Sequence, residues 1–502
     1  MFPSVNNRIL KGGAIDFYTR ILGLENTMVR GIATKTLIYT FSGALPALAG
    51  FFLLAPLTQF LSRDLYAIQA LYLSISLLFQ VIITYGLDQF LVRNYVNSKD
   101  EAYRADLVSQ VFSSILLIGV LLFAVFALTG SFSFEVILQS SDAHFFPFGA
   151  LSIGTALFNS LIKAFTNLLI YKEDPLRFLW VNVINTFVYI VGVFVGLHFF
   201  PETLWGPVGG RFLAGFVGVV IVFSYLFRKE KFRFYFRFPK GSLAYCAPVL
   251  LFGAVMWGMS LGNNYLINYA IHDLGHIAEF DLLLKFVMII ELFHNGLTSA
   301  LSPKLFRLWS EKNRGEEEHN LHILFNAVSI LLIASSVLLL PVFWPLVVKN
   351  HAFDHVVWLF PLIAFGYAFR GIYNYYVNPI YFMEKTHRLP IVFALSFVIH
   401  AVIAFFLIKE FKLVGALAGM SLSRVVQSII LRLVNHDLKP TKEHYSTVVL
   451  APGIYAALLV ALFFIIEPGV ILNILQFALA LLLVGLFYGK ALWAMILRNK
   501  NG

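Results

Sequence analysis

Five basic side chains lie inside long apolar segments of the sequence. Arg211 is close to the end of its segment and can reach the membrane surface. The other four are Lys163, Lys285, Arg370 and Arg424. An ionised side chain that faces hydrocarbon costs about 3 kcal/mol or more, so each of these groups needs a partner or a water-filled cavity. Guanidinium and ammonium groups are common protein ligands of phosphate and pyrophosphate. A cavity lined by these cations would therefore suit an anionic ligand.

Three acidic residues accompany the cations and are the candidates for ion coupling: Glu291, Asp281 and Asp88. Asp281 and Lys285 are four residues apart and can pair on one helix. Glu291 has no basic residue at helical spacing, so it is either protonated or neutralised from another helix, with Arg370 and Arg424 as candidates. With all these groups ionised the interior is net basic, although an ion-pair network could neutralise part of it.

Amide and hydroxyl side chains recur every three or four residues in several apolar segments and form polar stripes along the predicted helices. The candidates for the lining of a polar cavity are Gln80, Thr84, Asn159, Asn185, Asn264, Asn295, Asn374 and Gln427. Such groups recognise sugar hydroxyls. The alternative for any one of these residues is a hydrogen bond to a neighbouring helix, without a role in binding.

The composition is that of a polytopic membrane protein: 59% of the 502 residues are hydrophobic, 13% are charged, and the mean hydropathy is +0.80. The single cysteine, Cys246, excludes an internal disulfide and a cysteine metal cluster. The sequence has no phosphate-binding loop, no metal-ligand spacing and no nucleophile elbow. We therefore expect no cofactor, no metal and no enzymatic activity.

The apolar segments predict an all-α fold of about fourteen membrane-spanning helices, because each segment is long enough to cross a bilayer. The predicted spans are 36–60, 65–91, 106–129, 145–170, 178–200, 205–227, 243–271, 277–302, 321–348, 354–382, 390–408, 413–434, 446–466 and 469–494. The loops between them are short, so no sizeable soluble domain is expected.

Lysine and arginine are concentrated in alternate connections. Only Arg63, Lys349, Lys409 and Lys412 fall in the loops of the opposite set. Because basic residues favour the cytoplasmic side, both termini are predicted to be cytoplasmic. The net charge of +10 is attributed to these loops and not to nucleic-acid binding. No cleavable signal peptide is expected, since the first 35 residues are polar.

A weak internal repeat, in which residues 67–93 align with residues 278–304 without a gap, predicts two pseudo-symmetric six-helix lobes. We expect a cytoplasmic segment at 1–35 with an amphipathic helix at 14–30, lobes at 36–227 and 243–434, a basic linker at 228–242, and an extra helix pair at 435–502. Repeat-built transporters bind substrate between the repeats. The expected breakpoints are Pro46, Pro56, Pro248, Gly253, Gly258 and Gly262.

Two short phrases resemble one protein family. The second predicted span opens with Ser62-Arg63-Asp64-Leu65-Tyr66-Ala67-Ile68-Gln69 and ends with Gly86-Leu87-Asp88, Leu91-Val92-Arg93 and Tyr95; the eighth contains Ile277-Ala278-Glu279-Phe280 and Lys285. This pattern is similar to the polysaccharide biosynthesis or oligosaccharide flippase (Wzx-like) family of the multidrug/oligosaccharidyl-lipid/polysaccharide (MOP) exporter superfamily. Ala67 and Ala278 stand where the family usually has glycine. Asn263-Asn264 replaces an acidic-basic pair that relatives often show, which weakens any coupling mechanism taken from that position.

The resemblance implies a flippase of a bacterial cytoplasmic (inner) membrane that moves undecaprenyl-pyrophosphate-linked oligosaccharide for surface polysaccharide synthesis. Its partners would be the lipid-linked oligosaccharide, membrane lipids, and polysaccharide polymerase or export proteins, and we expect a monomer. The alternatives are a flippase for the peptidoglycan lipid precursor, a MATE-type multidrug or cation antiporter, and a membrane enzyme of glycan assembly. Extruders of cationic drugs need embedded acids, and an enzyme needs a large loop or a catalytic cluster, so both fit less well.

Overall fold

The computed structural model describes residues 27–138, 144–311, 315–438 and 446–500. Over these ranges the chain is almost entirely helical and contains no strand, so the predicted all-α membrane fold is confirmed. Most of the predicted N-terminal segment and of its surface helix at 14–30 lies outside the described residues, which begin at Thr27.

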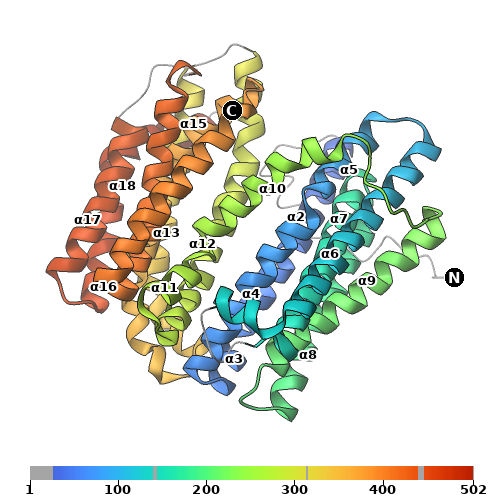
Figure 1. Ribbon diagram of the computed structural model, residues 1–502. Coiled ribbons are helices and arrows are strands. Elements are labelled where there is room, and N and C mark those ends of the chain that lie inside the picture. Colours follow the sequence, from blue (N-terminus) through green and yellow to red (C-terminus); the bar gives the residue numbers. More distant parts are fainter. Residues whose placement is uncertain (1–26, 139–143, 312–314, 439–445, 501–502) are drawn as a thin grey trace.

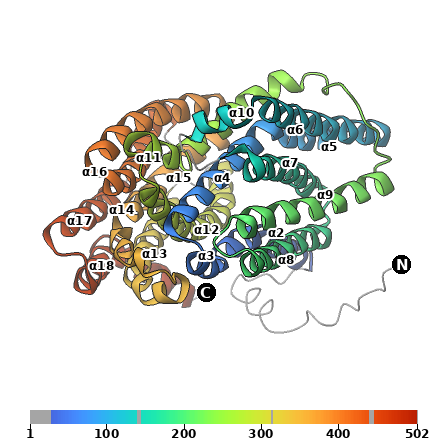
Figure 2. The ribbon, with the colours of Figure 1, turned by 60° about the horizontal axis from the view of Figure 1, so that its bottom comes forward.

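Long helices make up both halves of the chain, and Figures 1 and 2 show their arrangement from two directions. The first half contains α2 (Thr27–Phe52), α3 (Leu54–Phe60), α4 (Arg63–Thr84), α5 (Leu87–Asn97), α6 (Glu101–Leu138), α7 (Ala150–Tyr171), α8 (Pro175–Phe199) and α9 (Gly210–Lys229). The second half contains α10 (Ser242–Met259), α11 (Asn263–Ile271), α12 (Leu274–Ser310), α13 (Glu316–Val347), α14 (Phe360–Ala364), α15 (Arg370–Phe382), α16 (Leu389–Val434), α17 (Ala451–Ile465) and α18 (Val470–Lys500).

The two halves gather on opposite sides of the molecule, with α6 to α9 on the right of Figure 1 and α13 to α18 on the left. Helices α4 and α12 lie between them and pack against each other. These are the two helices that carry the aligned repeat segments. Their pairing places the two repeats at the centre of the molecule.

Twelve helical segments of the described chain are long and apolar enough to cross a membrane. One of them, Thr386–Val434, leaves helical geometry at Lys412 (φ 50°, ψ −123°) and so consists of two crossing segments. Helix α12 is 37 residues long, which also suffices for a crossing, but it carries several charged residues. The predicted count of about fourteen is consistent with these segments.

The two predicted helices that contain the expected breakpoints are interrupted, and the breaks coincide with only one of those residues, Gly262. In the seventh span the helix stops between Met259 and Asn263, while Pro248 is accommodated inside α10. In the first span α2 runs through Pro46, and the break falls at Leu53. A proline within a membrane helix can be tolerated where neighbouring helices surround it, so the prolines did not locate these breaks.

The tenth span was predicted as a single helix at 354–382, but the structure divides it into several helical segments. It begins with a 3-10 segment (His351–Leu359, η3), continues as α14, returns to 3-10 geometry (Phe365–Phe369, η4), and becomes α-helical again at Arg370. A Cβ added at Gly366 would lie 2.7 Å from the backbone of Ser421 on α16. This close approach accompanies the 3-10 turn that sets the direction of Arg370.

Helices α4 and α12 meet at their N-terminal ends, and we call this region the packed end. Arg63 of α4 pairs with Glu279 of α12, and the Lys285 ammonium donates to the Tyr66 hydroxyl at 2.6 Å. Helix α11 adds the Tyr265 hydroxyl, which donates to the Leu71 carbonyl at 2.9 Å. Polar contacts across α4, α11 and α12 thus join the two halves of the chain at this end.

Candidate functional site

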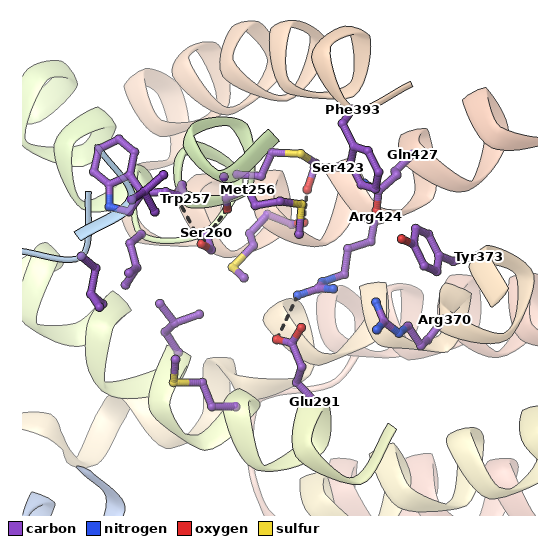
Figure 3. Close-up of a pocket in the computed structure, with 18 of the residues that line it drawn as sticks. Met256, Trp257, Ser260, Glu291, Arg370, Tyr373, Phe393, Ser423, Arg424 and Gln427 are labelled. Atoms are coloured by element: carbon purple, nitrogen blue, oxygen red, sulfur yellow. Dashed lines mark hydrogen bonds and ion pairs between the residues drawn. The ribbon is translucent and has the colours of Figure 1, made fainter. Parts of the chain in front are cut away.

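A cavity of about 420 Å³ lies next to the packed end, one or more turns further along α4 and α12. Helix α4 contributes Leu77, Gln80 and Val81, and α7 contributes Lys163. The other lining residues come from α10, the break between α10 and α11, α12, α15 and α16. The cavity is therefore shared between the two halves of the chain. Figure 3 shows its polar and apolar sides.

An ion pair crosses the polar side of the cavity. The Arg424 Nη2 atom on α16 lies 3.8 Å from Oε2 of Glu291 on α12. The buried Tyr367 hydroxyl donates to the same carboxylate oxygen at 3.3 Å and accepts a hydrogen bond from Arg424. Glu291 is thus neutralised from another helix, one of the two alternatives that its spacing left open.

Arg370 points into the same side of the cavity from the first turn of α15, as Figure 3 shows. Its Nη2 atom donates to Oδ1 of Asn295 at 2.9 Å, and its guanidinium carbon lies 4.9 Å from the centre of the Tyr373 ring. Within the described parts of the chain, no carboxylate pairs with Arg370, and its buried Nε has no hydrogen-bond partner. This guanidinium is the uncompensated charge of the cavity.

Lys163 lies at the first-half side of the cavity, and its side chain is 49% exposed. Its ammonium is 3.3 Å from Oδ2 of Asp88, which also accepts a hydrogen bond from the Asn167 amide at 3.0 Å. With Lys163 and Arg424 each paired to a carboxylate, Arg370 leaves the cavity with a net positive charge. Such a site favours an anionic group that can accept hydrogen bonds from a guanidinium.

The opposite side of the cavity is apolar and rich in methionine. Four of the eight methionines of the chain line it: Met256, Met259, Met288 and Met420. Trp257 lies beside them and donates its indole N–H to the Ser74 carbonyl at 2.8 Å. Methionine side chains are flexible and fill irregular space, so this wall can adapt to an apolar ligand segment.

The structure brings six of the fifteen predicted site residues to the cavity: Gln80, Lys163, Glu291, Arg370, Arg424 and Gln427. The buried Gln427 amide nitrogen has no hydrogen-bond partner within the described residues. A ligand that accepts a hydrogen bond there would satisfy it, since an unpaired buried donor is costly.

The remaining nine predicted residues lie outside this cavity: Thr84, Asp88, Asn159, Asn185, Asn264, Asp281, Lys285, Asn295 and Asn374. Lys285 is the clearest case, because it pairs with Asp281 at 2.7 Å and is only 12% exposed at the packed end. Asn264 donates to the Ser74 hydroxyl at 3.0 Å, and Asn185 to the Ala214 carbonyl at 3.0 Å. These side chains hold helices together, which was the alternative reading of the polar stripes.

Asn295 and Asn374 form a layer just outside the cavity. Asn295 accepts from Arg370, and the Asn374 amide donates to the Thr298 hydroxyl at 2.9 Å, which ties α15 to α12. These asparagines would therefore affect a bound ligand only indirectly, by holding Arg370 in position.

The packed end contains a buried carboxylate that the polar stripes did not single out. Glu279 is fully buried, pairs with Arg63, and lies 2.9 Å from both His276 on α12 and His355 on η3. Arg63 was predicted only as an outer-loop cation. Its carboxylate partner is more than two hundred residues away in sequence, so no local spacing could reveal the contact.

The closing phrase of the second span forms a joint between α4 and α5. Tyr85 and Gly86 both have left-handed backbone geometry (φ 51° and 75°), and a Cβ on Gly86 would lie 2.8 Å from the Val249 side chain. Only glycine fits this position without strain. The turn places Asp88 beside Lys163 and Arg93 over the Tyr245 ring at 5.0 Å.

The fold is similar to that of solved membrane transporters. The structure of lipid II flippase MurJ in an inward closed conformation matches with a TM-score of 0.67 and 13% identity, over 92% of this chain and 100% of that one. An inward-facing multidrug resistance MATE family transporter of the MOP superfamily matches with a TM-score of 0.64 and 13% identity, over 80% and 96% of the two chains.

The polysaccharide biosynthesis protein family model matches residues 32–309, which is more than half of the chain. The chain therefore belongs to that family, as its two phrases predicted, and its described residues contain the many apolar helices of a multi-pass membrane protein. The MATE multidrug transporter DinF-BH has the same fold, with a TM-score of 0.57 and 12% identity, over 82% of this chain and 96% of that one. No curated protein sequence matches the chain significantly.

Proposed function

We propose that this protein is a flippase that moves polyprenyl-pyrophosphate-linked oligosaccharide across a bacterial cytoplasmic membrane, for the synthesis of surface polysaccharide. The observation that carries the proposal is the uncompensated Arg370 in a cavity with a polar and an apolar side. Pyrophosphate accepts hydrogen bonds from guanidinium groups. The amides of Gln80 and Gln427 suit sugar hydroxyls, and the methionine wall suits the first part of a lipid tail.

The proposed transport is by alternating access between two lobes, residues 36–227 and 243–434, joined by the linker 228–242, with residues 435–502 as an appended pair. The pairing of Arg63 with Glu279 supports this scheme, because it is an ion pair between the two halves at the N-terminal ends of α4 and α12. Opening that end requires these contacts to separate. The break at Tyr85 and Gly86 and the break between α10 and α11 provide places where the helices can bend.

The proposed orientation has both termini in the cytoplasm and the packed end toward the outside, as the distribution of lysine and arginine predicts. An interior-negative potential then favours export of an anionic head group, by about 2.3 kcal/mol per charge per 100 mV. We propose Glu291 as the first candidate for the carboxylate that binds a coupling ion, since it is 38% exposed within the cavity and contacts Arg424. Asp281 and Asp88, already paired with lysines, are the remaining candidates.

Deletion of the gene in its host tests this proposal when it is followed by analysis of lipid-linked oligosaccharides and surface polysaccharide. The expected result is loss of surface glycan, with a complete repeat unit left on its lipid at the inner leaflet. Unchanged glycan together with new sensitivity to cationic drugs would identify an extruder and overturn the proposal. Complementation of a strain depleted of its peptidoglycan precursor flippase would identify that activity in its place.

A further inference from the structure

The connection between α9 and α10 has an unusual pattern of aromatic and basic residues. Phenylalanine occupies 232, 234, 236 and 238; Lys231 precedes the first of them, and Arg233, Tyr235 and Arg237 lie between them. The segment 231–238 forms no helix or strand. In an extended chain alternate side chains point to opposite sides, so this spacing separates an aromatic side from a basic side.

The segment is fixed to α6 by its backbone. The Arg233 N–H donates to the Ser109 hydroxyl at 3.2 Å, and the Tyr235 N–H donates to the Ser113 hydroxyl at 3.1 Å. Two residues of extended chain and one turn of helix both advance by about 6 Å, so the two pairs of partners are in register. The Tyr235 hydroxyl also bonds the Asp106 carboxylate of α6, which raises the pKa of Tyr235.

The aromatic side continues the outer surface of α9. Phe232 is buried and its ring centre lies 5.4 Å from that of Phe227, which is 53% exposed near the end of α9. Phe234 follows at 4.9 Å from Phe232 and is half exposed, and Phe236 is 90% exposed. Helix α9 presents Phe216, also half exposed, on its membrane-spanning part. The row of rings therefore passes from the membrane-spanning helix onto the connecting segment.

The basic side carries an unneutralised charge. Six exposed cations lie in the last turn of α9 and in the connection: Arg228, Lys229, Lys231, Arg233, Arg237 and Lys240. None of them forms an ion pair with a carboxylate in the described part of the chain, and the one acidic residue of the connection, Glu230, is paired with Lys172. Exposed aromatic rings beside uncompensated cations are typical of a surface that lies at the headgroup level of a membrane.

We propose that the segment 231–238 is a membrane-surface anchor: Phe234 and Phe236 enter the interfacial region, and the neighbouring cations bind the phosphate groups of anionic phospholipids. Charge complementarity selects this occupant, because the segment offers cations and apolar rings together. The anchor would hold the connection between the two halves at the leaflet while the helices on either side move. It depends on membrane insertion alone and is independent of the transported substrate.

Spin labelling tests this proposal in the full-length protein. The only cysteine, Cys246, is fully buried, so a Cys246→Ser background allows a single label at Phe236→Cys. The protein is reconstituted in vesicles of phosphatidylcholine alone or of phosphatidylcholine with phosphatidylglycerol, and accessibility to oxygen is compared with accessibility to a water-soluble nickel chelate. Labels at Phe216→Cys and Lys99→Cys serve as the membrane and aqueous references.

We expect the label at 236 to favour oxygen in vesicles with phosphatidylglycerol and to shift toward the nickel chelate in phosphatidylcholine alone. In the double variant R233Q/R237Q the label should favour the nickel chelate in both membranes. The control variant K304Q/R307Q removes two cations elsewhere and should behave like the parent. Preference for the chelate in both membranes would overturn the proposal. Preference for oxygen in both, whether or not the cations are present, would overturn the role of anionic lipid.

Discussion

Arg424 and Glu291 lie 3.8 Å apart on α16 and α12, and this pair leaves Arg370 as the cavity cation without a carboxylate in the described part of the chain. The two arginines therefore have different electrostatic surroundings in one site. Arg424 brings a counter-charge with it, whereas Arg370 offers a net charge to a ligand. The proposed binding of pyrophosphate depends mainly on that difference.

Replacement of Arg424 by alanine should abolish transport with little loss of folding. Both partners of its ion pair are partly exposed, at 20% and 38% of their side chains, so the pair contributes under about 1 kcal/mol to stability. Transport by reconstituted protein and thermal unfolding in detergent check the two parts. If R424A/E291Q regains full transport, Arg424 serves only to neutralise Glu291, and the expectation from the sequence that it binds the anionic ligand is wrong.

The contact between Arg63 and the buried Glu279 should keep the packed end closed. Replacement of Glu279 by glutamine should favour opening of the packed end by about 1 to 3 kcal/mol. The lower part of this range is expected because Arg63 is 36% exposed. Maleimide labelling of Ser74→Cys, a fully buried position on α4, should become at least several-fold faster in a Cys246→Ser background. Glu317→Gln, which removes an exposed pair with Lys304, should leave the rate unchanged. Equal labelling rates in E279Q and its parent would show that this contact does not control opening.

Gly86→Ala should lower stability through two separate effects. The left-handed backbone costs about 1 to 2 kcal/mol for a residue with a Cβ, and the new atom would also press on Val249 of α10. Gly241→Ala is the matched control, because Gly241 has a similar φ of 79° with nothing within 4 Å. The melting temperature should fall further for Gly86→Ala than for Gly241→Ala. Equal losses would mean that packing between α5 and α10 contributes nothing.

The contribution of the pair between Arg388 and Asp437 to folding stability should depend on pH and disappear in acid. Arg388 donates two hydrogen bonds to this carboxylate, at 2.6 and 2.9 Å, and lowers the pKa of Asp437 from 3.8 to about 2. Because the folded pKa is depressed, the contribution is present above the unfolded pKa and is lost as pH falls through the folded one. The difference in melting temperature between wild type and Asp437→Asn should therefore be small but constant down to about pH 4 and should shrink below it. A difference that persists undiminished near pH 2 would contradict this assignment.

The membrane fold could be predicted from the sequence because its main signal is local. Long apolar runs predicted the helices, and the two aligned repeat segments lie on α4 and α12, which pack against each other. The 3-10 turns before Arg370 could not be predicted, since they accompany the close approach of Gly366 to Ser421 from another helix. The break between α10 and α11 includes the expected breakpoint Gly262, whereas Pro248 remains inside a packed helix and does not interrupt it.

The candidate site was predictable in part for the same reason. Charges within apolar runs are visible in a sequence, and Arg370, Arg424 and Lys163 all line the cavity. Partners on other helices are not visible in a sequence, so it could not show that Lys285 donates a hydrogen bond to Tyr66 or that Glu279 pairs with Arg63. The methionine wall was missed because methionine in a membrane helix carries no positional signal until the cavity is known.

Transbilayer movement of a short-chain polyprenyl-pyrophosphate disaccharide in vesicles containing the purified protein tests the central claim most directly. Wild type, Arg370→Ala and Arg370→Lys are compared with Arg307→Ala, which removes an exposed cation at the end of α12. The account predicts movement by wild type and Arg307→Ala, loss with Arg370→Ala at normal protein level, and partial recovery with Arg370→Lys, since lysine restores charge without the guanidinium fork. Full movement by Arg370→Ala would contradict the claim that this cation binds the head group.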